Sequence, residues 1–298
     1  MNGFLEALKE KVLLFDGGMG SMLIAAGLGE GEAPDEWSIL HPESLVDIHT
    51  KYLEAGADVI QTNTFGATSI KLTASCRGGA PDTAALNMKA AEIARQALDE
   101  FMFGGRFLAG DIGPTGEFFP PMGTLSVDAA RKAFREQAAA LEKGGVDLFL
   151  IETMYDIREA VEAIRAVREV SDKPIVCELT MDRKKKGYFT IVGDSPEKAV
   201  EVLVAEGADV IGANCSITSG EMKDLAAEMR SLTDKPLLFQ PNAGLPVFSD
   251  GIAIYGQESE EFAADLMKIV EAGANAVGGC CGTTPDFIRT VRRRLDKA

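Results

Sequence analysis

The sequence predicts a closed (β/α)8 (TIM) barrel, and three observations lead to this prediction. Short apolar runs alternate with amphipathic stretches along the chain, there are eight such runs, and one turn signal recurs between helices and strands. The length of 298 residues also suits one barrel, because this fold needs roughly 250 residues before insertions. We therefore expect a single domain over residues 1–298.

The eight apolar runs are rich in β-branched residues and lack helical periodicity. Such runs are typical of strands in a parallel sheet that is covered on both faces. A doubly wound open sheet is the alternative, although no Gly-x-Gly-x-x-Gly motif follows the first run to suggest a dinucleotide. In order, the runs are Val12–Gly17, Ala57–Phe65, Phe107–Gly113, Val146–Thr153, Pro174–Met181, Ala208–Cys215, Pro236–Gly244 and Ala274–Gly282.

Between these runs, apolar residues at three- and four-residue spacing predict helices. The turn signal is a glycine, then Ala or Val, then Asp or Asn, at residues 56–58, 145–147, 207–209 and 273–275. Glycine is expected where a helix stops. Arg183–Lys186 should be a solvated turn, whereas the arginines at 292–294 should end the last helix. The clearest helical patterns are Ala129–Lys143, Ile157–Val170, Pro196–Ala205 and Glu260–Glu271.

Composition narrows the class of function. The formal net charge of −16 repels nucleic-acid phosphates and anionic lipid, so neither nucleic acid nor a membrane is an expected partner. Residues 1–12 carry four charges and lack the apolar stretch of a signal peptide, and no later segment offers 18 uncharged apolar residues. We expect a cytoplasmic protein with a large hydrophobic core.

Polar and sulfur-containing residues end the predicted strands. In a (β/α)8 barrel the catalytic residues lie on the loops that follow the carboxyl ends of the strands. These side chains should therefore ring one mouth of the barrel: Asp16, Asn63, Asp111, Glu152, Cys215, Asn242, Cys280 and Cys281.

Three of the five cysteines predict a metal site. Cys215 ends the sixth run and the adjacent pair Cys280 and Cys281 ends the eighth, so the three sulfurs can converge across a closed barrel. Three thiolates suit Zn²⁺, and three protein ligands with one open position are typical of a catalytic site. The remaining two, Cys76 and Cys177, are expected to be small buried hydrophobic residues.

The ligand type also indicates the chemistry. Three thiolates leave zinc electron-rich and a poor polariser of carbonyls, so amide hydrolysis is disfavoured. A thiol that coordinates zinc loses its proton, yet it keeps the nucleophilicity that attack on a methyl carbon requires. Neither His41 nor His49 ends a predicted strand, which argues against histidine-based catalysis.

With these motifs in place, the chain resembles the homocysteine S-methyltransferases, and most closely the homocysteine-binding barrel of cobalamin-dependent methionine synthase. The final Gly-Gly-Cys-Cys-Gly motif is highly specific. The matching segments span nearly the whole chain: Asp16-Gly-Gly-Met-Gly20, Ala55-Gly-Ala-Asp58, Thr62-Asn-Thr-Phe-Gly66, Gly110-Asp-Ile-Gly-Pro114, Glu152-Thr153, Asn214-Cys215, Pro241-Asn-Ala-Gly244 and Gly278-Gly-Cys-Cys-Gly-Thr-Thr-Pro285.

The resemblance implies zinc at the three cysteines, with the sulfur of homocysteine as the fourth ligand and methionine as the product. It implies that Asn242 fills the fourth position before substrate arrives. It also implies that Asp16 and Glu152 hold the substrate's ammonium group, while backbone amides around Gly17 and Gly18 receive its carboxylate.

Some of these residues have a plainer interpretation. Asp16 could instead cap the following helix, and Glu152 could close a structural network. Asn63 and Asp111 are expected near the substrate, either in contact with it or as hydrogen-bonding support.

The methyl donor stays open at this point. The matched pattern ends just after the eighth predicted helix, so the folate, corrinoid and reactivation modules of the full enzyme are not expected within it. The donor is then methylcobalamin on a separate protein or module, or a small onium compound such as S-methylmethionine or betaine. The loop Gly116–Gly123 contains Phe118 and Phe119 and is expected to form an apolar lip for a large methyl carrier, or to fold down on the barrel's own surface.

Two other functions fit the same cysteines. A corrinoid-dependent methyltransferase could act on another small methylated compound or thiol. A non-catalytic zinc-binding module would need a fourth protein ligand closed to exogenous thiol.

Overall fold

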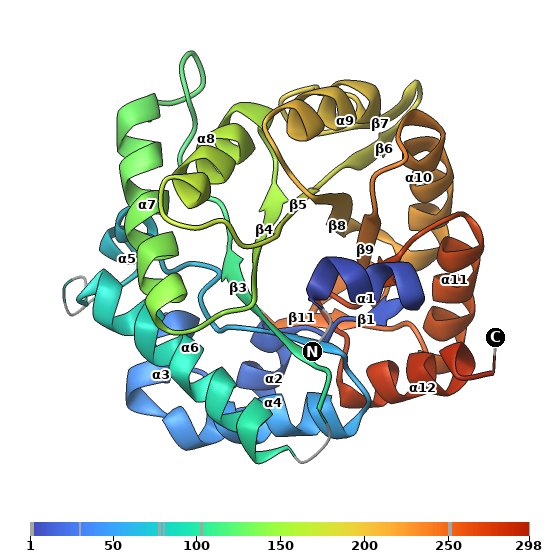
Figure 1. The fold of residues 1–298 in the computed structure, drawn as a ribbon, viewed down its shortest axis with the longest axis horizontal. Coiled ribbons are helices and arrows are strands. Elements are labelled where there is room, and N and C mark those ends of the chain that lie inside the picture. The colour runs from blue at the N-terminus through green and yellow to red at the C-terminus, as the bar shows by residue number, and fades with distance from the viewer. Residues whose placement is uncertain are drawn as a thin grey trace.

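The eight strands predicted from the apolar runs form one closed parallel sheet. In the computed structural model, which describes residues 3–29, 31–76, 79, 81–101, 104–249 and 252–297, every run contains a strand. The order is β1-β12-β9-β8-β5-β4-β3-β2, and a parallel bridge from Phe15 to Val59 joins the two ends. The open-sheet alternative is therefore wrong (Figure 1). The strands are β1 (Leu13–Leu14), β2 (Val59–Gln61), β3 (Phe107–Ile112), β4 (Leu148–Met154), β5 (Ile175–Leu179), β8 (Val210–Thr218), β9 (Leu237–Asn242) and β12 (Ala276–Val277).

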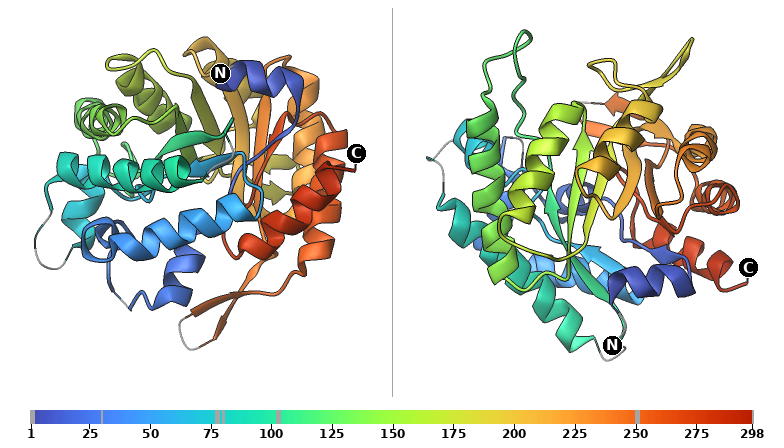
Figure 2. Two further views of the ribbon diagram at one scale, coloured as in Figure 1. Left: turned by 60° about the horizontal axis from the view of Figure 1, so that its bottom comes forward. Right: turned by 45° about the horizontal axis from the view of Figure 1, so that its top comes forward.

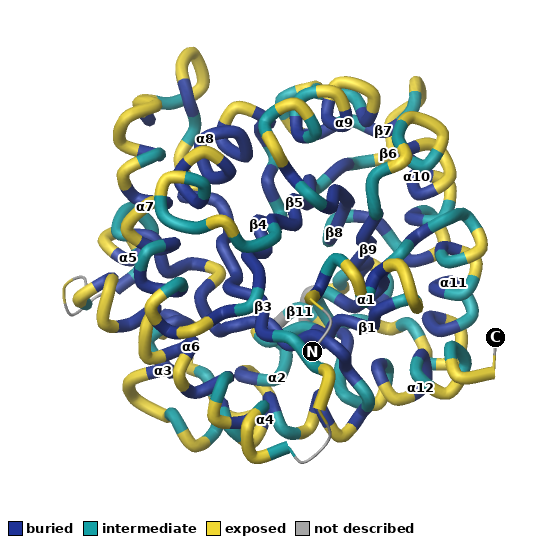
Figure 3. Tube along the Cα trace, viewed as in Figure 1, coloured by how far each residue is buried: buried dark blue, intermediate teal, exposed yellow. Residues whose placement is uncertain are grey.

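Helices surround this sheet, and Figure 3 shows their exposed outer faces around the buried strands. The four clear helical patterns of the sequence correspond to α7, α8, α9 and α11, and the arginines at 292–294 end α12 as expected. The outer helices are α4 (Pro42–Glu54), α6 (Thr83–Glu100), α7 (Val127–Lys143), α8 (Ile157–Arg168), α9 (Pro196–Ala205), α10 (Ser219–Leu232), α11 (Ser259–Glu271) and α12 (Pro285–Leu295). Every helix within the described ranges is too short or too polar to cross a lipid bilayer.

The recurring turn signal has a structural reason. Its glycines have positive φ values, from 83° at Gly145 to 108° at Gly273, a region that favours glycine. Its Asp or Asn side chain then accepts a hydrogen bond from a backbone amide of the neighbouring strand. Asp58 binds the amide of Leu14 at 2.9 Å, and Asp147 binds that of Leu108 at 2.7 Å. Each signal therefore ends a helix and ties the next strand to its neighbour.

Asp209 and Asn275 repeat this contact in the other half of the barrel. Asp209 accepts from the amide of Ile175 at 2.9 Å, and Asn275 accepts from that of Leu237 at 3.1 Å.

One end of the barrel is closed by the first helix, α1 (Phe4–Glu10), which lies across it in Figure 1. Phe4 and Leu8 on this helix pack into a buried cluster with inward residues of the strands, including Leu13 and Phe15. The amino-terminal half of the barrel is thus a dry apolar core. The functional cavity must lie at the opposite end.

Nearer that opposite end the interior turns polar. Glu178 on β5 is fully buried, and neither of its carboxylate oxygens has a hydrogen-bond partner among the described residues. Burial raises its pKa well above the ordinary range, followed by a smaller effect of the Glu152 charge. Gly212 faces it, where a Cβ would meet the Leu238 carbonyl oxygen at 1.8 Å. Glu178 is therefore a neutral acid in a space that a side chain at position 212 would fill.

Two hairpins interrupt the barrel repeat, and the sequence interpretation did not separate either one. The first pairs β6 (Asp182–Lys184) with β7 (Gly187–Phe189). Only residues 185–186 of the basic run form the expected turn, because Arg183 and Lys184 belong to β6. The second pairs β10 (Pro246–Ser249) with β11 (Ile252–Tyr255) after β9, and it projects from the barrel in Figure 2. Shorter segments between β1 and α6 are α2 (Met19–Ala26), η1 (Pro34–Glu36), α3 (Trp37–Leu40) and α5 (Ser69–Ser75).

Candidate metal centre and substrate pocket

A cavity of about 720 Å³ opens at the carboxyl ends of the strands. All but one of the site residues predicted from the sequence line it, although they come from strands and loops spread over most of the chain. The exception is Asn242, which is buried beside the cavity wall. The predicted residues in the lining are Asp16, Gly17, Gly18, Asn63, Asp111, Glu152, Cys215, Cys280 and Cys281.

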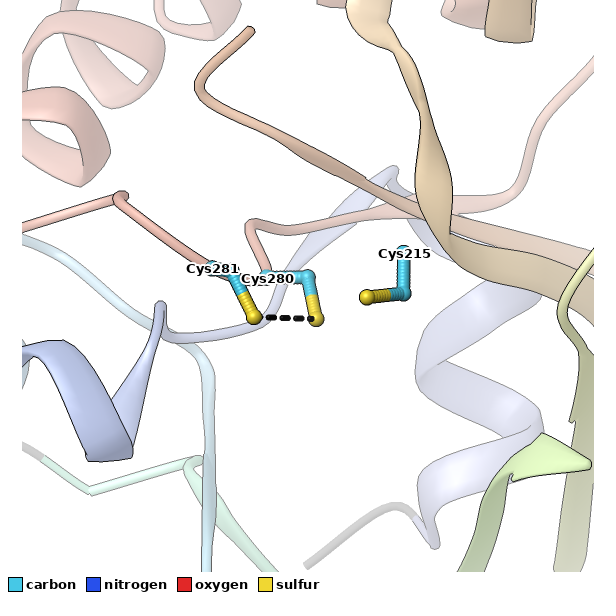
Figure 4. Close-up of side chains that lie close together, drawn as sticks. All are labelled: Cys215, Cys280 and Cys281. Carbon is cyan, nitrogen blue, oxygen red and sulfur yellow. Dashed lines mark hydrogen bonds between the residues drawn. The ribbon is translucent and has the colours of Figure 1, made fainter. Parts of the chain in front are cut away.

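The three cysteines converge on one wall of this cavity. Their sulfur atoms all lie within 4.8 Å of one another, and Cys280 Sγ lies 4.0 Å from Cys281 Sγ (Figure 4). A tetrahedral zinc ion with Zn–S bonds of about 2.3 Å separates its sulfur ligands by about 3.8 Å. The observed cluster is close to this spacing, so the three thiols fit one zinc ion.

Irregular backbone aims Cys215 into the cavity. The pairing of β8 with β9 shifts register between Asn214 and Thr218. Within that shift, Cys215 and Ser216 adopt positive φ values of 58° and 40°. Residues other than glycine rarely adopt this conformation, and such strain concentrates at functional sites. The β4 strand has the same irregularity, a register shift between Ile151 and Met154 with Thr153 at a φ of 55°.

The loop of Cys280 and Cys281 is held by Thr283. The Thr283 hydroxyl donates to the Cys280 carbonyl at 2.6 Å and accepts from the Gly18 amide at 3.1 Å. The buried Tyr52 hydroxyl donates to the Thr283 carbonyl at 3.0 Å. A Cβ on Gly18 would lie 2.6 Å from the Cys280 carbonyl oxygen, so only glycine allows these two loops to approach so closely. The first and last loops of the barrel are therefore locked together beside the cysteines.

Asp16 is almost fully buried in the cavity floor. It accepts hydrogen bonds from the Gln61 backbone amide at 3.0 Å and from the Gln61 side chain at 2.6 Å. Burial raises the pKa of Asp16 to about 7, although the bonds from Gln61 oppose the shift. The alternative role as a cap of α2 is wrong, because the N-terminus of that helix has no side-chain cap.

Glu152 lines the same cavity as the cysteines and the other two carboxyl groups. The Asn214 amide donates to it and also to Thr153 Oγ1 at 2.8 Å. Burial raises the pKa of Glu152 to about 7. Burial and then the Glu152 charge raise the pKa of Asp111 well above its ordinary range. Asn214 and Gln61 were not assigned from the sequence, because only the folded barrel shows which carboxylates they contact.

Of the four remaining predicted groups, Gly17 lines the cavity, and the other three are engaged with the protein. Asn63 donates to the Pro34 carbonyl at 2.8 Å. The Gly18 amide donates to Thr283, as described above, and so is not free for an anion. Asn242 Oδ1 accepts from the Cys281 amide at 3.1 Å, which places the side chain against the cysteine loop.

Free amides lie one step further along the chain from Gly18. Met19, Gly20 and Ser21 form the first turn of α2, where backbone amides have no partner within a helix. The first intrahelical bond runs from Met22 to the Gly18 carbonyl. Gly20 and Ser21 both line the cavity. The amides that lack a partner are therefore those at the N-terminus of α2, whereas the Gly18 amide is already bonded to Thr283.

Residues outside the cavity agree with their plainer interpretations. Cys76 and Cys177 are buried among hydrophobic side chains. In the expected lip, the Phe119 ring is buried under the Arg158 guanidinium at 5.3 Å, and the Phe118 ring contacts Tyr155 at 5.2 Å. No residue of Gly116–Gly123 lines the cysteine cavity. The two rings therefore pack on the protein, whereas Pro120, Pro121 and Met122 of the same loop are exposed, next to a second groove beside α7 and α8.

A model of the family described as homocysteine S-methyltransferase matches residues 13–295. The chain belongs to this family. The methionine synthase of Mycobacterium leprae (strain TN) is 32% identical over 308 residues, which cover 96% of this chain but only 24% of that protein. The chain thus spans about a quarter of the length of that relative.

Solved structures give the same result for the fold. The metallated form of the homocysteine methyltransferase MmuM from Escherichia coli is 27% identical, with a TM-score of 0.80 over 97% of this chain and 99% of that one. Its apo form is 26% identical with a TM-score of 0.76 and the same coverage. The carboxyl transferase domain of Rhizobium etli pyruvate carboxylase, 18% identical with a TM-score of 0.53 over 98% of this chain and 49% of that one, shares the fold alone.

The lock at Thr283 gives a testable prediction. Thr283→Val keeps the shape of the side chain but removes the hydroxyl that joins Cys280 to Gly18, so it should lower the free energy of unfolding by about 1–2 kcal/mol. Thr283→Ser keeps the hydroxyl and serves as the matched control. Urea denaturation measures both. Equal stability of the valine variant and the wild type would show that this hydroxyl does not hold the loops together.

Proposed function

We propose that the protein transfers a methyl group to the thiol of L-homocysteine, giving methionine, with Zn²⁺ held by Cys215, Cys280 and Cys281. One observation carries the proposal. Three cysteine sulfurs and two buried carboxylates share one cavity in a member of the homocysteine S-methyltransferase family. On this proposal, residues 1–298 form a homocysteine-binding domain.

The sulfur set suits this role because it leaves one position of a tetrahedral ion for substrate. When bound there, zinc lowers the pKa of a coordinating thiol, which supplies a nucleophilic sulfur at neutral pH. The chain itself contributes no nucleophile. Its residues orient the acceptor, and orientation of two reactants removes much of the entropic barrier.

The amino-acid end of homocysteine is proposed to bind opposite the cysteines. Asp16 and Glu152 are buried acceptors for the ammonium group, and a charge in a sheltered cleft requires such partners. Asp111, whose pKa is raised by burial and by the Glu152 charge, lines the same cavity. The substrate carboxylate is assigned to the free amides at Met19–Ser21, rather than to Gly18.

The methyl donor is proposed to enter over the apolar rim of the cavity. Ile24 and Phe65 line the cavity and are partly exposed. A corrinoid carried by another protein or module and a small onium compound both remain donor candidates. This route leaves out the predicted lip, because no residue of Gly116–Gly123 lines the cavity. The role of Asn242 as the fourth ligand before substrate binds stays a proposal, supported by its contact with the Cys281 amide.

Metal analysis and a methylation assay test the proposal together. Wild-type protein should bind one zinc per chain and form methionine from homocysteine with methylcobalamin or S-methylmethionine. Cys215→Ser and Cys280→Ser should lose zinc and activity, because each removes one of three ligands. Cys76→Ser and Cys177→Ser are matched controls that should keep both. Zinc retained by Cys215→Ser, or methylation only of other thiols, would refute the assignment.

The buried carboxylate Asp16 predicts a pH effect on acceptor binding. The pKa of Asp16 is about 7, so this carboxyl group becomes protonated as pH falls below 7. It must then release the proton in order to bind the ammonium group, and affinity for homocysteine should drop. The analogue 4-mercaptobutyrate has the same thiol and carboxylate but no ammonium group, and it corrects for titration of the thiol. The ratio of KM for homocysteine to KM for the analogue should rise several-fold from pH 8 to pH 6. A constant ratio would remove Asp16 from the ammonium site.

A further inference from the structure

The Asn214 side chain lies between the two halves of the proposed acceptor site. It is fully buried, and it comes from β8, which is separated by one strand from β4 on one side and by one strand from β12 on the other. Glu152 is on β4, and Cys280 follows β12. Because side chains from alternate strands share a layer inside a barrel, Asn214 can contact both of these residues.

Printed distances between atoms show that it does so. The Asn214 amide nitrogen Nδ2 donates hydrogen bonds to the Glu152 carboxylate and, at 2.8 Å, to Thr153 Oγ1. The same nitrogen lies 4.0 Å from Cys280 Sγ. Asn214 Oδ1 accepts from the Thr153 backbone amide at 2.9 Å. A backbone N–H can only donate, so this last bond fixes which end of the Asn214 amide faces Glu152 and Cys280.

The backbone beside these contacts is strained at both ends. Thr153 and Cys215 have positive φ values of 55° and 58°, and both lie within register shifts of their strands. Such conformations persist where the surrounding structure over-determines them. The two hydrogen bonds between Asn214 and Thr153 join one strained segment directly to the other. The separation between the Glu152 carboxylate and the Cys280 sulfur is therefore held by more than the barrel alone.

A fixed separation matters for a substrate that is bound at both ends. On the proposed function, Glu152 receives the ammonium group of homocysteine, while the sulfur binds the metal that Cys280 helps to hold. L-Cysteine carries the same two groups with one methylene fewer between them. It cannot place both groups equally well, and misplacement of a reacting group by about 1 Å can cost roughly a hundred-fold in rate.

We propose that Asn214 is a positioning residue that sets the distance between the Glu152 carboxylate and the Cys280 sulfur, and that it thereby selects L-homocysteine over the shorter L-cysteine. This inference rests on the proposed function. Asn214 contacts neither reacting atom and acts through the residues that hold the two ends of the acceptor. Its loss should therefore change the preference between two chain lengths, which a general loss of stability would leave unchanged.

Calorimetric titration of zinc-loaded protein tests this role without a methyl donor. The titration gives Kd for L-homocysteine, and displacement gives Kd for L-cysteine. The ratio of Kd for cysteine to Kd for homocysteine should fall several-fold in Asn214→Ala and in Asn214→Asp. The alanine variant removes every contact of the side chain. The aspartate variant keeps an oxygen to accept from the Thr153 amide, but it replaces the NH2 group that faces Glu152 and Cys280.

Asn87→Ala is the matched control. Asn87 is as fully buried as Asn214, and its amide donates to the carbonyls of Ala67 and Thr83 at 2.8 Å each. It does not line the cavity. This variant loses the same kind of buried amide, so its stability should fall while its ratio of Kd values stays at that of the wild type.

Zinc content and circular dichroism are measured first on each protein, so that the two proposals fail separately. Wild-type protein that binds no zinc, or neither thiol, would refute the proposed function. An unchanged ratio in folded, zinc-loaded Asn214 variants would overturn the role of Asn214, as would equal affinity of the wild type for the two thiols. A folded variant that does not take up zinc would also overturn it, because all three cysteines are still present. If Asn214→Ala does not fold, Asn214→Asp decides, because it keeps the size of the side chain.

Discussion

The approach of three cysteine sulfurs to within 4.8 Å is the constraint on which the rest of the site depends. Cys215 and the Cys280–Cys281 pair are 65 residues apart in the chain, but they follow β8 and β12, which have only β9 between them in the sheet, so the strand order brings them together. Closure also places the Gly18 loop against Cys280, through Thr283. Asp16, from the first strand, thereby reaches the same cavity as the last loop. An open sheet with β1 and β12 at opposite edges would separate Asp16 from that loop.

Departures from ideal strand geometry position residues of the candidate site. The register shifts in β4 and β8 fall at Glu152–Thr153 and at Cys215–Ser216, where non-glycine residues adopt positive φ values. Asn214 links the two irregular segments, because its side chain contacts both Glu152 and Thr153. The proposed ammonium site and metal site are thus joined by one side chain. Movement of either irregular segment should disturb both.

The sequence was sufficient to predict the barrel and the residues at its mouth, because strand ends and turn signals are local features. Cys215, Cys280, Asp16 and Glu152 could be chosen because each ends an apolar run. Contacts between distant segments could not be predicted from the sequence. The use of the Gly18 amide by Thr283, the pairing of Gln61 with Asp16 and the burial of Phe119 all depend on packing across the barrel. The hairpin that carries Tyr255 was missed because its short strands follow a longer apolar run without a helix between them.

X-ray absorption at the zinc edge, with and without L-homocysteine, measures the central claim most directly. The account predicts a first shell of three sulfurs and one lighter atom in the free protein, which becomes four sulfurs when homocysteine binds. This change would show the metal, its open position and its acceptor in one experiment. A shell that stays the same on addition of homocysteine, or a site without zinc, would contradict the account while leaving the barrel and the family unchanged.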